Sequence, residues 1–207
     1  MANSELAVET KSTRVYQGLR REIVNGAYGP GRVLVRRHLV QKYGVSLSII
    51  NEALARLVHD GLVESPENES TRVVDWNEEV ARDNFALREA VERHVVRLLA
   101  ESATAETLAS LRGDARSLDQ WLLTEEPNSI LHLEFHVKLA RSTGFRSLEE
   151  TLKRTGVRAL LTSRWLAYQA LPHPPDFHEQ LVIAIASRDP FLADAKIRDH
   201  LHFGLEK

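Results

Sequence analysis

Two histidines four residues apart, His132 and His136, have the type and spacing of residues with a chemical role. On a helix, residues four apart project from the same side, and here they share that side with the apolar Leu139. Neutral imidazole is a common ligand of divalent transition metals. The pair is therefore a candidate part of a metal site. The alternative, that each is a hydrogen-bonded core or surface histidine, stays open.

Two more histidines, His178 and His200, fall in separate helical patterns near the end of the sequence. If the three helices met, their imidazoles would surround one divalent ion. The chain has no cysteine, which excludes disulfides, thiolate metal sites and cysteine nucleophiles. Every metal ligand must then come from His, Asp, Glu or similar groups. The remaining histidines with no partner at a readable spacing are expected at the surface or in packing: His38, His94, His173 and His202.

The second half of the chain must position these histidines, and its apolar residues follow helical periods throughout. Helix-start signals support the boundaries, including Thr104, Ser147 and Pro175. Short connections force neighbouring helices to run in opposite directions, so the pattern predicts an antiparallel all-α bundle. The predicted helices cover residues 77–102, 103–123, 128–142, 146–171, 175–188 and 189–204.

The first half is broken every dozen residues by Gly, Pro, Asn or Ser. Val15, Leu19 and Ile23 predict a helix that ends at "NGAYGPG". A short second helix leads through Gly44 to a third, which begins at Ser46 as N-cap. The apolar face of that third helix comprises Ile50, Ala53, Leu54 and Leu57.

Two short β-prone runs, "LVES" and "TRVVD", follow the third helix and predict a hairpin with a polar tip. A helix-turn-helix closed by a hairpin is a winged helix, which most often places its second motif helix in the DNA major groove. Winged helices also serve as protein-interaction modules, so both uses remain open. The fold class is mainly α: a winged helix-turn-helix followed by the bundle.

The domain organisation follows from this change of pattern. Residues 1–10 are expected to form a flexible arm, residues 11–75 a DNA-binding winged helix, and residues 76–207 a helical bundle that carries the candidate metal site. The chain has 27 Lys and Arg against 29 Asp and Glu, so any nucleic-acid contact must be local. No apolar run approaches membrane-spanning length, and the N-terminus lacks a signal core. We expect a cytoplasmic protein without membrane contact.

Several stretches resemble the GntR-type transcription regulators of the FadR-like subclass, whose C-terminal ligand-binding domain is called FCD. In the first half these are "LRREIVNGAYGPGRVL", "LVQKYGVS" and "EALARLVHDGLV". In the second half they are "FALREAVE", "EFH" and "FHEQLVIAIASRDPFLADAKIRDHL". The resemblance covers residues 15–200, and the last stretch is its most specific part.

The resemblance implies that His136, His178 and His200 are metal ligands. Family members often have Asp as a fourth ligand where this chain has His132. An all-histidine site carries one negative charge fewer, which favours zinc or nickel over harder ions and strengthens the hold on an anion. The family's usual effectors are small carboxylates. Arg88 occupies the matching arginine position, and its alternative is a salt bridge to Glu92.

The DNA-reading residues depart from the family's Ser-Arg-Thr-Pro-Val-Arg run, because this chain has "SLSIIN". Leu47 and Asn51 replace two arginines, and the wing tip carries Glu67 and Glu69. Asn51 is expected to bond adenine and Leu47 to touch a thymine methyl. The expected DNA contacts are Arg36, Arg37, Ser46, Leu47, Ser48, Asn51, Arg56 and Arg72, where the arginines hold phosphates.

These features favour a metabolite-responsive transcription regulator and not an enzyme. A homodimer would place two recognition helices on a palindromic operator, and a bound carboxylate would change the spacing between them. The alternative is a regulator with weakened DNA affinity that acts through a protein partner, which "SLSIIN" and "PENES" suggest. A metal-dependent hydrolase built on His59 and Asp60 is disfavoured, because no carboxylate has the spacing of a general base.

Overall fold

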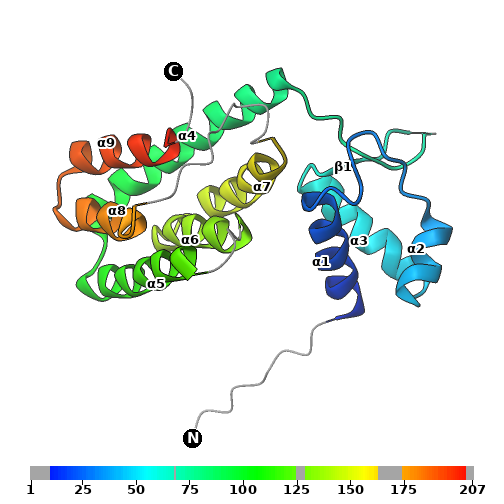
Figure 1. Ribbon diagram of the computed structural model, residues 1–207, viewed down its shortest axis with the longest axis horizontal. Coiled ribbons are helices and arrows are strands. Elements are labelled where there is room, and N and C mark those ends of the chain that lie inside the picture. The colour runs from blue at the N-terminus through cyan, green and yellow to red at the C-terminus, as the bar shows by residue number, and fades with distance from the viewer. Residues whose placement is uncertain (1–9, 68, 125–128, 163–173, 204–207) are drawn as a thin grey trace, which may run out of the picture. The chain divides into compact units, whose positions relative to one another are not determined.

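The computed structural model describes residues 10–67, 69–124, 129–162 and 174–203. The chain divides into two units, Met1–Trp76 and Asn77–Lys207, called here the winged-helix unit and the bundle (Figure 1). Most of the expected flexible arm lies outside the described residues. Its last member, Thr10, caps the first helix by accepting a hydrogen bond from the Thr13 N–H at 3.1 Å.

Three helices build the winged-helix unit: α1 (Lys11–Val24), α2 (Arg36–Tyr43) and α3 (Leu47–His59). The turn between α2 and α3 passes through Gly44, whose φ of 62° is accessible to glycine at little cost. Helix α1 packs its apolar stripe against that of α3, and both stripes were predicted from the sequence. The residues buried between them include Val15, Leu19 and Ile23 of α1 and Ile50, Ala53, Leu54 and Leu57 of α3.

The predicted hairpin is present as β1 (Val63–Glu64) and β2 (Arg72–Val73). The two strands are antiparallel, with Val63 opposite Val73 and Glu64 opposite Arg72. An isolated antiparallel β-bridge pairs Val33 with Arg72, and the sequence did not predict this third segment of the hairpin sheet. One bridging residue is too short to leave a period-2 pattern, so the hydrophobic alternation gave no signal for it.

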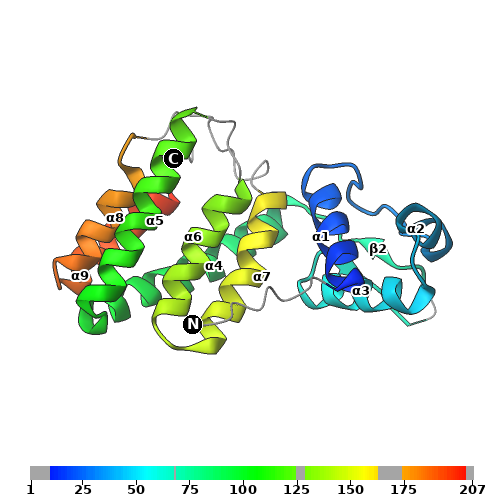
Figure 2. The same ribbon diagram turned by 90° about the horizontal axis from the view of Figure 1, so that it is seen from below.

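The bundle contains six helices among the described residues, and Figure 2 shows α5, α6 and α7 side by side with α4 behind α6 and α7. Each predicted segment corresponds to one of them. The end of the segment predicted over 146–171 lies outside the described residues. The observed bounds are α4 (Glu78–Ser102), α5 (Ala105–Thr124), α6 (Ser129–Ser142), α7 (Arg146–Thr162), α8 (Phe177–Ala186) and α9 (Pro190–Leu201). No described helix has the length and apolar character that a bilayer crossing requires.

Two contacts fix α7 within the bundle. Asn84 of α4 donates its amide to the Thr155 carbonyl at 2.9 Å, which satisfies a buried polar group across two helices. Gly156 faces α6 so closely that a Cβ atom there would lie 2.1 Å from Leu133 Cδ1. The missing side chain therefore lets α7 approach the segment of α6 that carries the paired histidines.

Arg188, in the turn between α8 and α9, connects that turn to the end of α4. Its φ of 64° is unusual for a residue with a side chain. Its guanidinium donates to the carbonyls of Ala100 at 3.4 Å and Ala103 at 2.5 Å. These bonds occupy carbonyls that the end of a helix leaves without helical partners. The side chain thus fixes the α8–α9 turn against α4.

Candidate metal centre and candidate DNA interface

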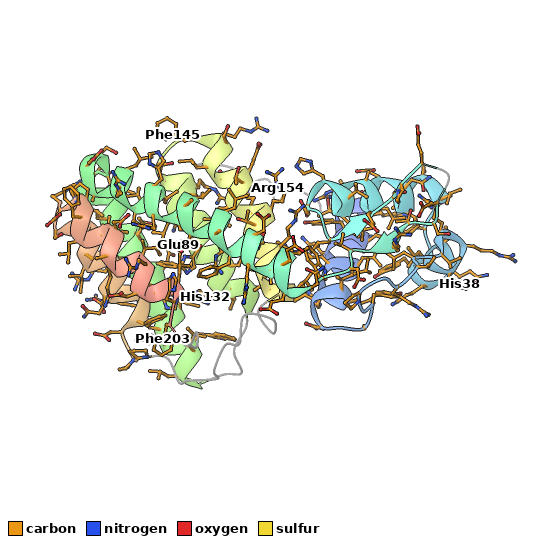
Figure 3. All side chains as sticks on the ribbon, turned by 90° about the horizontal axis from the view of Figure 1, so that it is seen from above. His38, Glu89, His132, Phe145, Arg154 and Phe203 are labelled. Atoms are coloured by element: carbon orange, nitrogen blue, oxygen red, sulfur yellow. The ribbon has the colours of Figure 1, made fainter. Side chains whose placement is uncertain are left out.

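Four histidines meet inside the bundle. Helix α6 supplies His132 and His136, while α8 and α9 supply His178 and His200. One ring nitrogen from each lies within 4.8 Å of the others. His136, His178 and His200 are buried, and His132 is partly exposed. Figure 3 labels His132 within the bundle. The structure therefore brings together all four histidines that the spacing singled out as ligands.

The distances between the imidazoles fit a shared cation. Nε2 of His136 lies 2.9 Å from Nε2 of His132 and 3.1 Å from Nε2 of His200, and the third side of this triangle is 3.4 Å. Nitrogens that share a metal at about 2.0 to 2.1 Å are separated by about 2.9 to 3.4 Å, depending on coordination geometry. A shared proton joins only two nitrogens, whereas a cation can bind all three.

Two buried carboxylates orient the imidazoles. The Nδ1–H of His136 donates to Glu92 Oε2 at 2.5 Å, and the Nδ1–H of His178 donates to Asp119 Oδ1 at 2.6 Å. Because each carboxylate binds Nδ1, the lone pair of each ring is left on Nε2. This is the arrangement that fixes the tautomer and raises the basicity of metal-binding histidines. The donor set therefore fits a divalent transition metal.

Glu92 is ionised despite its burial. Burial alone raises the pKa of this carboxyl, but electrostatic attraction to His136 and Arg88 and the hydrogen bonds from them outweigh it and lower the pKa to about 2. Arg88 Nε donates to Glu92 Oε1 at 2.6 Å, so the salt bridge considered as the alternative role of Arg88 is present. Glu92 therefore lies between Arg88 and His136 and binds both side chains.

Asp119 holds the start of α8 as well as its histidine. Its carboxylate accepts the backbone N–H groups of His178, at 3.0 and 3.1 Å, and of Glu179 at 2.9 Å. A side chain of α5 therefore caps α8, which begins at Phe177 and not at the predicted Pro175. Sequence reasoning did not find Asp119, because it lies in no motif and its partners are 59 and 60 residues away.

His200 is held neutral by its surroundings. Burial, followed by the neighbouring His136, His178, His132 and Arg88, lowers the pKa of His200 well below 6.5. The ring of Phe177 stacks on it, with centroids 4.1 Å apart and an angle of 17° between the planes. A neutral imidazole keeps the lone pair that a metal needs.

In the winged-helix unit, the expected DNA contacts lie in different settings. Leu47 is 52% exposed at the start of α3. Ser46 is the N-cap residue, but its hydroxyl bonds the hydroxyl of Ser48 at 2.9 Å and does not cap the backbone. Asn51 is exposed and accepts a hydrogen bond from Arg36 Nε at 3.0 Å. These residues share the outer surface of α3 and its neighbour α2.

The arginines expected at phosphates are divided between the surface and internal contacts. Arg56 points to α1, where Nη1 donates to Thr13 Oγ1 at 3.2 Å and the guanidinium lies 4.1 Å from the centre of the Tyr16 ring. Arg72 binds Glu64 at 2.6 Å and Glu69 at 2.8 Å. Arg37 is exposed. Arg56 and Arg72 therefore make contacts within the winged-helix unit.

The His59–Asp60 pair takes no part in the histidine centre. Asp60 accepts a hydrogen bond from the Tyr16 hydroxyl at 2.5 Å. Burial of the ring, together with this hydrogen bond, raises the pKa of Tyr16 to about 12. Asp60 therefore joins α1 to the end of α3 in the winged-helix unit.

The structure thus combines a winged helix, a fold that most often binds DNA, with a helical bundle that holds a buried cluster of histidines. The family model described as "Bacterial regulatory proteins, gntR family" matches residues 11–73, and the FCD domain model matches residues 83–203. The chain belongs to the GntR family and carries an FCD domain. It is a DNA-binding transcription regulator and not an enzyme.

Known proteins resemble the chain over most of its length. The HTH-type transcriptional repressor GlaR of Escherichia coli K12 is 24% identical over 205 residues, 90% of each chain. The Nta operon transcriptional regulator of Aminobacter aminovorans is 28% identical over 189 residues, 85% of each chain. The solved structure of E. coli McbR/YncC has a TM-score of 0.70 at 20% identity and covers 93% of this chain and 94% of its own. The predicted fold class is confirmed.

Proposed function

We propose that this regulator binds a divalent metal at His132, His136, His178 and His200 and responds there to a small carboxylate effector. The convergence of four imidazoles, two of them oriented by buried carboxylates, carries the proposal. When bound, the metal supplies positions at which a carboxylate oxygen can coordinate. Arg88 is the nearby cation that would bind the same anion, in exchange for its bond to Glu92.

The chemistry of the ligands favours zinc or nickel. Four neutral imidazoles suit borderline ions, whereas magnesium and calcium prefer oxygen ligands. His132 provides nitrogen at the position where relatives often provide a carboxylate, so the centre keeps more of the positive charge of the ion. We infer a stronger attraction for an anionic effector on that account.

We further propose that the chain acts in the cytoplasm as a homodimer. Two copies would present two α3 helices to the halves of a palindromic operator, because symmetry in the protein is matched by symmetry in the DNA. Effector binding would change the bundle and so the spacing between the two helices. Measured operator affinity, with and without a panel of small carboxylic acids, tests this part of the proposal.

Elemental analysis of the untagged protein tests the metal centre. We expect about one zinc or nickel ion per chain in the native protein and a large loss in the His136→Ala variant. His202→Ala is the matched control, because His202 is exposed and binds Glu89 at the surface. A native protein without stoichiometric metal, even after dialysis against zinc or nickel, would reject the centre.

A second candidate function is a regulator that binds DNA weakly and acts through a protein partner. The exposed Leu47 and the pairing of Arg72 with wing carboxylates favour it. Introducing arginine at both Leu47 and Asn51 should then increase DNA affinity strongly over the native chain. Equal affinities of the two proteins for a selected operator would exclude this candidate.

A further inference from the structure

The outer surface of α3 carries no lysine or arginine of its own. Every residue of α3 is described, and its exposed members are Leu47, Ser48, Asn51, Glu52, Ala55, Val58 and His59. The helix does contain Arg56, but that side chain binds Thr13 and the Tyr16 ring on the inner side. Any cation that reads bases beside this surface must therefore come from another element.

Arg36, the first residue of α2, provides that cation. Its Nε donates to Asn51 Oδ1 at 3.0 Å, which holds the guanidinium against the exposed surface of α3. The donor in this bond is an arginine N–H, so the atom of Asn51 that accepts it is the amide oxygen. Arg36 and Asn51 also line a hollow of about 470 Å³ together with Ala55, Val58 and the wing residues Ser65 and Thr71.

This bond decides which hydrogen-bonding groups remain for a partner. The oxygen of Asn51 faces Arg36, so the amide NH₂ is the group left to face outward. The guanidinium keeps the donors on its two Nη atoms, and arginine has no acceptor. The pair therefore presents donors to whatever enters the hollow, and one of those donors is charged.

We propose that Arg36 and Asn51 act as one base-reading unit that recognises the acceptor edge of a guanine. This inference rests on the operator binding of the family and names how this chain, which lacks the family's arginines at 47 and 51, reads sequence. In the major groove guanine presents two acceptors, O6 and N7, whereas adenine presents one acceptor and one donor. Bidentate adenine recognition by asparagine needs the amide oxygen, which already accepts from Arg36, and the guanidinium beside it disfavours the N6–H₂ donor of adenine. Guanine therefore replaces the adenine expected from residue type alone.

The pair is distinct from a simple phosphate contact. A phosphate needs charge, which lysine supplies as well as arginine. Base reading needs the planar fork and its fixed position, which the bond to Asn51 provides. Arg37 is the next residue of α2, is exposed and carries the same charge without a bond to Asn51. It is therefore the matched control for Arg36.

Random-oligonucleotide selection with the full-length chain, followed by titration at several salt concentrations, tests the inference. We expect the native protein to select a motif with a guanine that it prefers over adenine about tenfold or more. Arg36→Lys and Asn51→Ala should each reduce that preference several-fold at the same position, because lysine can still meet the guanine acceptors but lacks the fixed fork. The double variant should lose no more than either single one. Arg36→Lys should keep the native salt dependence, because its charge is unchanged.

The Arg37→Ala control should weaken binding to guanine and adenine operators equally and reduce the salt slope by about one. A guanine preference that keeps its native size in Arg36→Lys would overturn the inference. A motif with adenine at that position, lost only in Asn51→Ala, would overturn it as well. In both cases operator binding itself would stand. A native chain that selects no sequence would reject operator binding and the inference together. Unchanged thermal midpoints of the variants establish that they are folded.

Discussion

Glu92 and Asp119 in the bundle are 2% and 4% exposed, and each binds an imidazole, whereas the wing side chains of Glu64 and Glu69 are 41% and 54% exposed and bind Arg72. All four are carboxylates with a basic partner at hydrogen-bond distance. Water and salt screen the wing pairs, which are then worth about 1 kcal/mol or less. A buried carboxylate that loses its partner costs several times more. We therefore expect the size of a substitution's effect to follow the burial of the carboxylate, because all four carboxylates have a basic partner.

The largest expected effect is acid destabilisation of the metal-free bundle. The pKa of Glu92 falls from 4.5 to about 2 on folding, so the unfolded chain binds this proton first as pH falls. The resulting stability is fully present above pH 4.5, is lost between pH 4.5 and 2, and is on the order of 3 kcal/mol. The pKa of His200 is also lowered, which adds a loss that begins as pH falls through about 6.5.

Urea unfolding at a series of pH values measures this. The stability difference between the native chain and Glu92→Gln should shrink from pH 5 to pH 3. Glu101→Gln, an exposed change on the same helix, should run parallel to the native curve. If the difference in unfolding free energy between the native chain and Glu92→Gln stayed constant over that range, the Glu92 carboxylate would stabilise the fold no more than an exposed carboxylate does.

A pair of glycine substitutions compares buried and exposed positions without any charge. Gly156→Ala places a methyl group against Leu133, so we expect a loss of about 1 to 3 kcal/mol in unfolding free energy and weaker metal binding through displacement of α6. At Gly113, an exposed position of α5, an added Cβ atom would meet nothing within 4 Å. Gly113→Ala should therefore increase the unfolding free energy by about 0.5 to 1 kcal/mol. Denaturant unfolding measures both, and equal effects would contradict the close approach of α7 to α6.

Asp119→Asn should weaken zinc binding by about tenfold to a hundredfold, because the amide keeps an acceptor for His178 but loses the charge. Competition with a chromophoric chelator measures the affinity. Asp114→Asn is the control on the same helix, since Asp114 pairs with Lys138 at the surface. If both variants bound zinc equally well, the orienting role of Asp119 would be rejected.

The smallest effect is expected at the wing. Glu69→Gln removes one partner of Arg72 and one negative charge that would face phosphates, so operator affinity should rise a few-fold at low salt and less at high salt. The unfolding free energy should change by less than about 0.5 kcal/mol. Glu106→Gln, an exposed change in the bundle, should leave operator affinity as it is. Reduced operator affinity in Glu69→Gln would show that this carboxylate aids binding.

Local periodicity was sufficient to predict the helices and to single out His132 and His136 as a pair, whereas His178 and His200 were added as ligands by the family resemblance. His132 and His136 are one turn apart on a single helix, and the apolar stripes of α1 and α3 repeat at helical spacing. Each of these signals lies within a few residues of sequence. The helix bounds were then correct to within a few residues wherever the structure describes them.

Contacts between distant segments were not predictable in the same way. The partners of His136 and His178 are 44 and 59 residues away, and only the packing of α4 and α5 brings them near. The same is true of Arg56, which was expected at a phosphate and instead lies over the ring of Tyr16. A charge count cannot tell a cation that meets DNA from one that packs inside its own domain.

Arg188 holds the turn between two histidine-bearing helices against the helix that carries Glu92. Glycine at this position would relieve the strained backbone while removing both bonds, so gain and loss would largely cancel in a melting experiment. A screen for thermal tolerance would then classify the position as silent. A screen for regulators that bind their operator but no longer respond to a signal would recover it, among residues that touch neither metal nor DNA.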